Sequence, residues 1–162
     1  MLRTEGQNEN LLKLANYLKA LPEDYDHFAM ESFIEGNVVN YIFPRSLYNS
    51  DILNSCGTIA CAVGHGPAAG IRPKKDEFWV GYSHRAFTID EDEWDWCFNG
   101  EWSEIDNTHV GAYKRIFYLI ENGLPDFDIE ERVMLYDSEG SLSEKELRRS
   151  DKERYNSLLE EY

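Results

Sequence analysis

The spacing of apolar residues predicts a first helix near the start of the chain. Across residues 9–21, leucine and alanine recur every three or four positions, which places them on one side of a helix. These apolar positions are Leu11, Leu14, Ala15, Leu18 and Leu21. Asn8 offers an N-cap, and Pro22 ends the helix because proline lacks the backbone donor that a helix needs. We therefore expect an amphipathic helix over residues 9–21 with its apolar side on a core.

Two further helices are predicted in the second half of the chain. Asp90 begins the first as an N-cap, with the carboxylate of Glu93 three residues on. The second begins after capping residues at 106–108 and runs to Asn122. Its apolar residues surround almost the whole helix, which indicates burial. Gly123 can adopt the left-handed conformation that ends such a helix.

Shorter stretches of alternating polarity predict strands. They cover residues 37–43, 78–82, 85–89 and 132–136, and the middle two would pair as a small antiparallel sheet. A short helix rich in small residues is expected at 56–64. We therefore predict an α+β fold dominated by about five helices.

The domain organisation predicted from this pattern is simple. Residues 1–140 form a single compact domain, because no repeat or linker interrupts them. Residues 141–162 form a charged helix appended to it, which either packs lightly on the core or joins two copies as a homodimer. Ser143 and Glu146 give that helix a capping signal.

Charge narrows the classes of partner. The 162 residues hold 31 acidic and 16 basic side chains, a net charge of −15. Eight of the acids lie between Asp90 and Asp106, where there is no Lys or Arg. Direct binding to nucleic acid or to an anionic membrane is disfavoured, since both would be repelled. A basic protein surface is the partner that this charge favours.

The sequence also predicts the compartment. No apolar run approaches the ~18 residues that span a bilayer, and residues 1–10 are polar with both charge signs, unlike a signal peptide. Three cysteines do not form a disulfide framework, so free thiols are expected. We expect a cytoplasmic protein with no cofactor.

Three motifs between residues 28 and 125 carry a resemblance to a known family. They are Phe28-x-Met30, the segment Cys56-Gly57-Thr58-x-Ala60-Cys61-x-x-Gly64-His65, and the run Trp94-x-Trp96-Cys97-Phe98-x-x-x-Trp102 followed by Asp106-Asn107-Thr108 and Arg115-Ile116. The chain resembles a family of short, uncharacterised proteins from phages and bacteria. That resemblance implies a phage-like origin and a role in interaction with a host, but no established activity.

The acidic, aromatic segment from 90 to 106 is the leading candidate site. Helix capping accounts for its first three or four carboxylates, whereas the rest are explained if they meet positive charge on another molecule. The candidate binding residues are Asp92, Asp95, Trp96, Glu101, Trp102, Glu104 and Asp106. The hypothesis is a non-enzymatic nucleic-acid mimic that occupies a basic surface of a host protein, such as a defence-system component. If the chain is phage-encoded, it would act in the host cytoplasm.

A cysteine-dependent hydrolase is the first alternative. Cys56 would begin a helix, where the backbone amides stabilise a thiolate, and His109 with Asp106 would supply the base and its orienting group. The segment from Cys56 is similar to that of bacteriocin-processing cysteine peptidases, although their histidine lies on a strand and His109 opens a helix. A stripe of small residues across 57–64, used for close packing, is the more economical interpretation.

A metal-stabilised accessory domain is the second alternative. Cys61 and His65 lie one helical turn apart, and Cys56 is nearby in the sequence. Cys97, or alternatively His84 or His109, would complete four ligands for zinc. The sequence contains no paired Cys-x-x-Cys spacing of the kind that structural zinc sites usually show.

Overall fold

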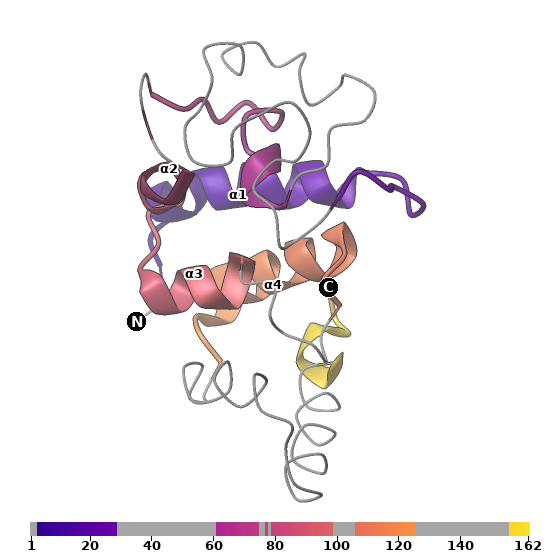
Figure 1. Ribbon diagram of the computed structural model, residues 1–162. Helices are drawn as coiled ribbons and strands as arrows, with labels where there is room; N and C mark the ends of the chain where they lie inside the picture. Colours follow the sequence, from indigo (N-terminus) through magenta and orange to yellow (C-terminus); the bar gives the residue numbers. More distant parts are fainter. Residues whose placement is uncertain (1–2, 29–60, 75–76, 78, 99–105, 126–155) are drawn as a thin grey trace, which may run out of the picture.

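The computed structural model describes residues 3–28, 61–74, 77, 79–98, 106–125 and 156–162. Its elements in chain order are α1 (Glu5–Lys19), the single 3₁₀ turn η2 (Val63–His65), α2 (Trp79–Phe87), α3 (Glu91–Phe98) and α4 (His109–Asn122) (Figure 1). Residues 156–159 are also helical. None of the helices in these ranges is long and apolar enough to cross a membrane.

The predicted α+β class is wrong for the described part of the chain, which contains no strand and therefore no antiparallel sheet. The two stretches expected to form that sheet, 78–82 and 85–89, instead contribute to α2. Their aromatic and β-branched residues favour a strand, but the side chains that become buried follow a helical period. These are Trp79, Tyr82, Ser83, Ala86 and Phe87. The strands predicted at 37–43 and 132–136 lie outside the described residues, as does most of the helix predicted at 56–64.

The first helix begins one turn earlier than the apolar spacing predicts. Thr4, rather than Asn8, is its N-cap, because the Thr4 hydroxyl accepts from the Gln7 amide while the Gln7 side chain accepts from the Thr4 amide. This reciprocal pair satisfies two backbone donors at the helix start. The predicted starts of α3 and α4 are confirmed, with Asp90 and Thr108 as the caps.

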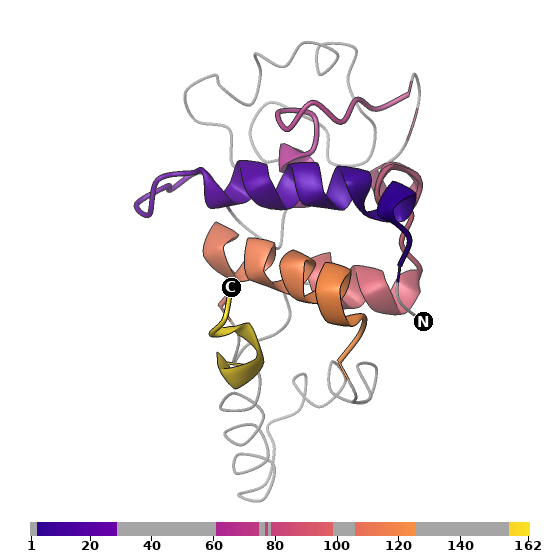
Figure 2. The ribbon, with the colours of Figure 1, turned by 180° about the vertical axis from the view of Figure 1, so that it is seen from behind.

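The helices form two layers with the core between them. α1 and α2 make one layer and α3 and α4 the other (Figures 1 and 2). α1 packs along α4, and the colours in Figure 2 show that the two run antiparallel. Their facing side chains are fully buried: Leu11, Leu14, Ala15 and Leu18 of α1, and Ala112, Ile116 and Leu119 of α4. Each such leucine contributes about 1.5–3 kcal/mol by leaving water.

The last seven residues cover the outer side of α4. Leu159 is buried, and its carbonyl accepts a hydrogen bond from the Lys114 ammonium at 3.2 Å. The Tyr162 ring stacks on Phe117, and its hydroxyl donates to Glu121 at 3.0 Å. The far end of the predicted C-terminal helix therefore packs on the helical core of its own chain.

Gly111 makes the turn before α4 possible. A Cβ at this position would lie 1.7 Å from the carbonyl oxygen of Asp106, far inside van der Waals contact. The chain that enters α4 passes so close to the helix that only glycine fits there.

We expect Gly111→Ala to destabilise the fold by about 1–3 kcal/mol, because the turn at residue 106 must move to admit the methyl group. Gly81→Ala on α2 is the matched control, since nothing lies within 4 Å of its Cβ position. That control should stabilise the protein by about 0.5–1 kcal/mol through helix propensity. Urea unfolding midpoints measure both changes, and a Gly111→Ala midpoint equal to that of the wild type would contradict this packing.

Candidate interaction site at the start of α3

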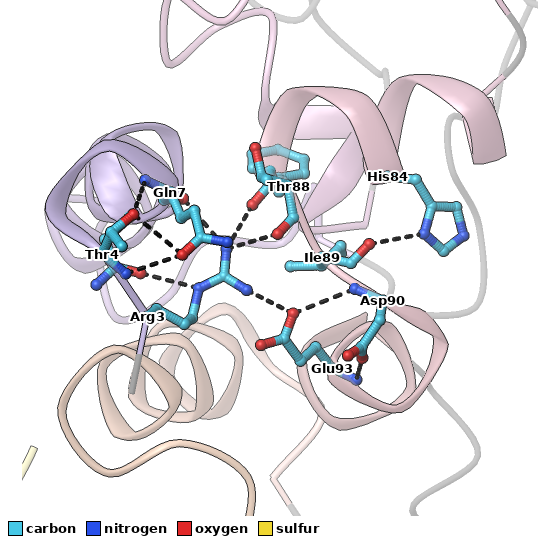
Figure 3. Close-up of polar contacts among 10 residues, drawn as sticks. Arg3, Thr4, Gln7, His84, Thr88, Ile89, Asp90 and Glu93 are labelled. Atoms are coloured by element: carbon cyan, nitrogen blue, oxygen red, sulfur yellow. Dashed lines mark hydrogen bonds and ion pairs between the residues drawn. The ribbon is translucent and has the colours of Figure 1, made fainter. Parts of the chain in front are cut away.

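The guanidinium of Arg3 joins α1 to the carboxyl end of α2 (Figure 3). One of its terminal nitrogens donates to the carbonyl oxygens of Phe87 and Thr88, each at 2.8 Å, and to that of Gln7 at 3.2 Å. Its Nε donates to the side chain of Asn8 at 2.9 Å. Because the carbonyls at a helix carboxyl end carry partial negative charge, a cation stabilises this end of α2. The Arg3 side chain is only 4% exposed.

The backbone turns sharply where Arg3 binds. Thr88 has φ of +52°, the left-handed region that costs a non-glycine residue free energy. This conformation ends α2 and redirects the chain, through Ile89 and Asp90, into α3. The two Arg3 hydrogen bonds to the carbonyls of Phe87 and Thr88 help to offset that cost.

Glu93 connects this turn to α3. Its carboxylate forms an ion pair with Arg3 and accepts from the Asp90 amide at 3.1 Å. The Asp90 carboxylate accepts in return from the Glu93 amide at 2.9 Å. Asp90 and Glu93 thus form a capping box, and the ion pair with Arg3 adds a third contact to the first turn of α3. We call Arg3, Asp90 and Glu93 the arginine clamp.

Two carboxylates at this end of α3 face solvent. Glu91 and Asp92 are exposed, and neither forms an ion pair with another described residue. Asp95, one turn further along the helix, is half-buried. Arg3, the cation of the arginine clamp, is enclosed and already paired with Glu93. Among the described residues, no ion pair therefore compensates the charges of Glu91 and Asp92.

The remaining predicted binding residues divide into three groups. Trp96 is fully buried, and its indole donates to the Arg115 carbonyl at 3.0 Å. Trp96 was expected on a binding surface, but it belongs to the core. Asp106 is exposed, but one of its oxygens accepts from both the amide and the hydroxyl of Thr108, which shapes the entry to α4. Glu101, Trp102 and Glu104 lie outside the described residues.

An open pocket of about 430 Å³ adjoins the arginine clamp. Its lining residues are Arg3, Gln7, His84, Thr88, Ile89, Asp90 and Glu93. His84 is held there by a hydrogen bond from Nδ1 to the Ile89 carbonyl at 3.1 Å. The sequence pattern gave no signal for this pocket, because Arg3 and Glu93 are 90 positions apart.

The thiols of the two described cysteines are poorly placed for chemistry. Cys61 and Cys97 are both buried. Burial raises the pKa of the Cys61 thiol to about 11 and that of Cys97 to about 12, so both are protonated at neutral pH. Cys56, the nucleophile of the hydrolase hypothesis, lies outside the described residues. Its predicted base, His109, is buried at the first position of α4.

The predicted metal ligands are only partly described. Both ring nitrogens of His65 are hydrogen-bonded, Nδ1 to the Cys61 carbonyl at 2.8 Å and Nε2 to the Tyr25 hydroxyl at 3.1 Å. A metal at His65 would have to replace one of these bonds. Within the described ranges, no three histidine, cysteine or acidic side chains are grouped so as to hold a metal ion.

Comparison with known proteins gives no relative from which to transfer a function: no family model, curated protein or solved structure matches the chain. The function must therefore be inferred from the chemistry of the described residues.

Asp90 and Asp92 provide a direct test of which carboxylates are structural. Asp90→Ala removes the N-cap and should lower the unfolding free energy by about 1 kcal/mol. Asp92→Ala removes an exposed charge of the same sign, so it should change stability by no more than ~0.5 kcal/mol. Equal losses in thermal or urea unfolding would show that Asp90 does not cap α3.

Proposed function

We propose that this protein is a non-enzymatic interaction protein that places the acidic start of α3 against a basic surface of another protein. The observation that carries this proposal is the pair of exposed carboxylates, Glu91 and Asp92, beside a clamp whose own cation is enclosed. Capping was expected to account for the first three or four carboxylates, but only Asp90 and Glu93 form the capping hydrogen bonds, so these bonds do not account for Glu91 and Asp92. Such a surface attracts Lys and Arg side chains and repels phosphates.

The hydrogen bonds around the turn support recognition, because they fix the backbone that carries Glu91 and Asp92 before a partner arrives. Asp90 and Glu93 fix the first turn through the capping box, and Arg3 fixes Glu93. A partner that meets a preorganised surface loses less conformational entropy on binding than one that must order a loop.

The wider charge distribution supports the same partner class. No Lys or Arg occurs between residues 90 and 106, so the negative field at α3 is not balanced by neighbours in the sequence. Fields of this kind accelerate encounter with oppositely charged proteins and weaken as salt screens them. The resemblance to phage proteins suggests a biological setting in which the basic surface belongs to a host protein that binds nucleic acid, such as a defence-system component.

Charge reversal at the start of α3 tests the proposal. The probe is a fluorescently labelled nonamer of arginine, titrated with the protein while anisotropy is recorded from 50 to 300 mM NaCl. Glu91→Lys combined with Asp92→Lys should weaken binding by about tenfold or more at low salt, since each lost charge–charge contact is worth about 0.5–1 kcal/mol and each new one is repulsive.

A matched control separates a local site from overall charge. Glu23→Lys combined with Asp24→Lys reverses two carboxylates that are equally exposed but lie after α1. It changes the net charge by the same amount, so it should weaken binding far less if the start of α3 is the contact surface. Equal weakening by the two double variants would show that only net charge matters, and the proposed site would be abandoned.

A further inference from the structure

Three of the four histidines surround one tyrosine ring. The ring centroid of Tyr25 lies 5.7 Å from that of His27, 5.7 Å from that of His65 and 6.1 Å from that of His109, each nearly edge-to-face. Phe28 contacts His65 and His109 as well, with centroids at 5.5 and 6.2 Å. The segment 22–28 is therefore attached to η2 and α4 largely through imidazole rings.

The hydrogen bonds of His65 define the tautomer of its neutral ring. A carbonyl oxygen can only accept, so Nδ1 carries the proton that is donated to Cys61. Nε2 then lacks a proton and accepts from the Tyr25 hydroxyl. The ring is almost completely buried, so a proton added at Nε2 would place a charge where water does not reach it, even though the Tyr25 hydroxyl oxygen can also accept from Nε2–H.

His109 is subject to a similar constraint. His109 is buried against Tyr25 and Phe28 and is the first residue of α4. The free backbone amides at a helix N-terminus carry partial positive charge, so they disfavour protonation of an imidazole there. Burial lowers the pKa of His109, while the charge of Asp106 acts in the opposite direction. For His65, burial lowers the pKa to about 4, and the nearby His109 and His27 add to the effect.

The other titratable groups around His65 and His109 do not offer a hydrogen-bonded carboxylate that would stabilise a protonated His65. Tyr17 of α1 packs on the His65 ring, and its pKa is raised by burial, so it stays neutral. Asp26 is paired with His27 at 3.5 Å, and Asp106 is bonded to Thr108. Among the described residues, none of these carboxylates is hydrogen-bonded to His65.

We propose that His65 and His109 form a proton-sensitive latch, which holds residues 22–28 against η2 and the start of α4 near neutral pH and releases them on acidification. This device is independent of the acidic surface on α3. Protonation of His65 places a positive charge in a site that water does not reach. Opening of the segment relieves this cost, because water then reaches the imidazolium.

The direction of the pH effect follows from the order of the pKa values. In the open state His65 would titrate near its ordinary value of 6.5, and in the closed state near 4. The closed state is thus fully favoured above about pH 6.5 and loses that advantage as the pH falls towards 4. For one proton, the equilibrium constant for opening rises up to about tenfold per pH unit in this window.

Hydrogen exchange read by mass spectrometry tests the latch in the full-length protein. After correction for the intrinsic pH dependence of exchange, the protection of residues 22–28 should fall about 20-fold between pH 7 and 5. Amides of α1 provide the internal reference and should keep their protection. In His65→Gln the pH dependence should be largely lost, whereas His84→Gln, a histidine on α2 away from Tyr25, should behave like the wild type. Unchanged protection of 22–28 at pH 5, or equal pH dependence in both variants, would overturn the proposal.

A second measurement on the wild type covers the case in which His65→Gln fails to fold. Nitrogen NMR shifts of the histidine rings should show His65 in the Nδ1–H form and still neutral at pH 5.5, when a solvent-exposed histidine is mostly charged. An Nε2–H tautomer, or protonation near pH 6.5 without a change in the exchange of residues 22–28, would also overturn it.

Discussion

The position of every described element around the candidate site depends on how Arg3 is bound. Its guanidinium donates to the last carbonyl oxygen of α2 and to that of the left-handed Thr88, and it pairs with Glu93 at the start of α3. Without that cation, the carbonyl oxygens of Phe87 and Thr88 would lose a buried donor, and the charge of Glu93, only 15% exposed, would be left unpaired. One side chain near the start of α1 thus links the two helical layers at the end where the acidic surface lies.

The core and the site make different demands on the same helices. Between α1 and α4 the fully buried contact is aliphatic, and the Lys19 ammonium of α1 lies over the Tyr113 and Phe117 rings of α4. The aliphatic part supplies stability without fixing a unique arrangement of charges. The polar contacts that specify how the layers meet lie at the two ends. The arginine clamp is at one end, and the histidine cluster, His27, His65 and His109 around Tyr25, is at the other. Each of them joins residues that are far apart in the sequence.

Sequence reasoning succeeded where the signal was local. The caps at Asp90 and Thr108, and the burial of the apolar side of α1, follow from spacings of three and four residues. It failed at α2, where the residue types favour strand while the burial pattern is helical, and at the start of α1, where Asn8 binds Arg3 and Thr4 provides the cap. The clamp and the histidine cluster were missed because contacts across 90, 84 or 40 positions leave no periodic trace in a single sequence. Trp96 was misplaced because an acidic neighbourhood does not reveal which side of α3 is buried.

The most direct test of the arginine clamp is a double-mutant cycle on Arg3→Gln and Glu93→Gln, read as unfolding free energies in urea. We predict a coupling energy of about 2 kcal/mol, because each single variant leaves the partner charge unpaired in a nearly buried site, whereas exposed ion pairs couple by only ~0.2–1 kcal/mol. Glu9→Gln with Lys13→Gln, an exposed pair on α1, gives the baseline. A coupling no larger than that baseline would contradict the claim that Arg3 holds the acidic start of α3 in place.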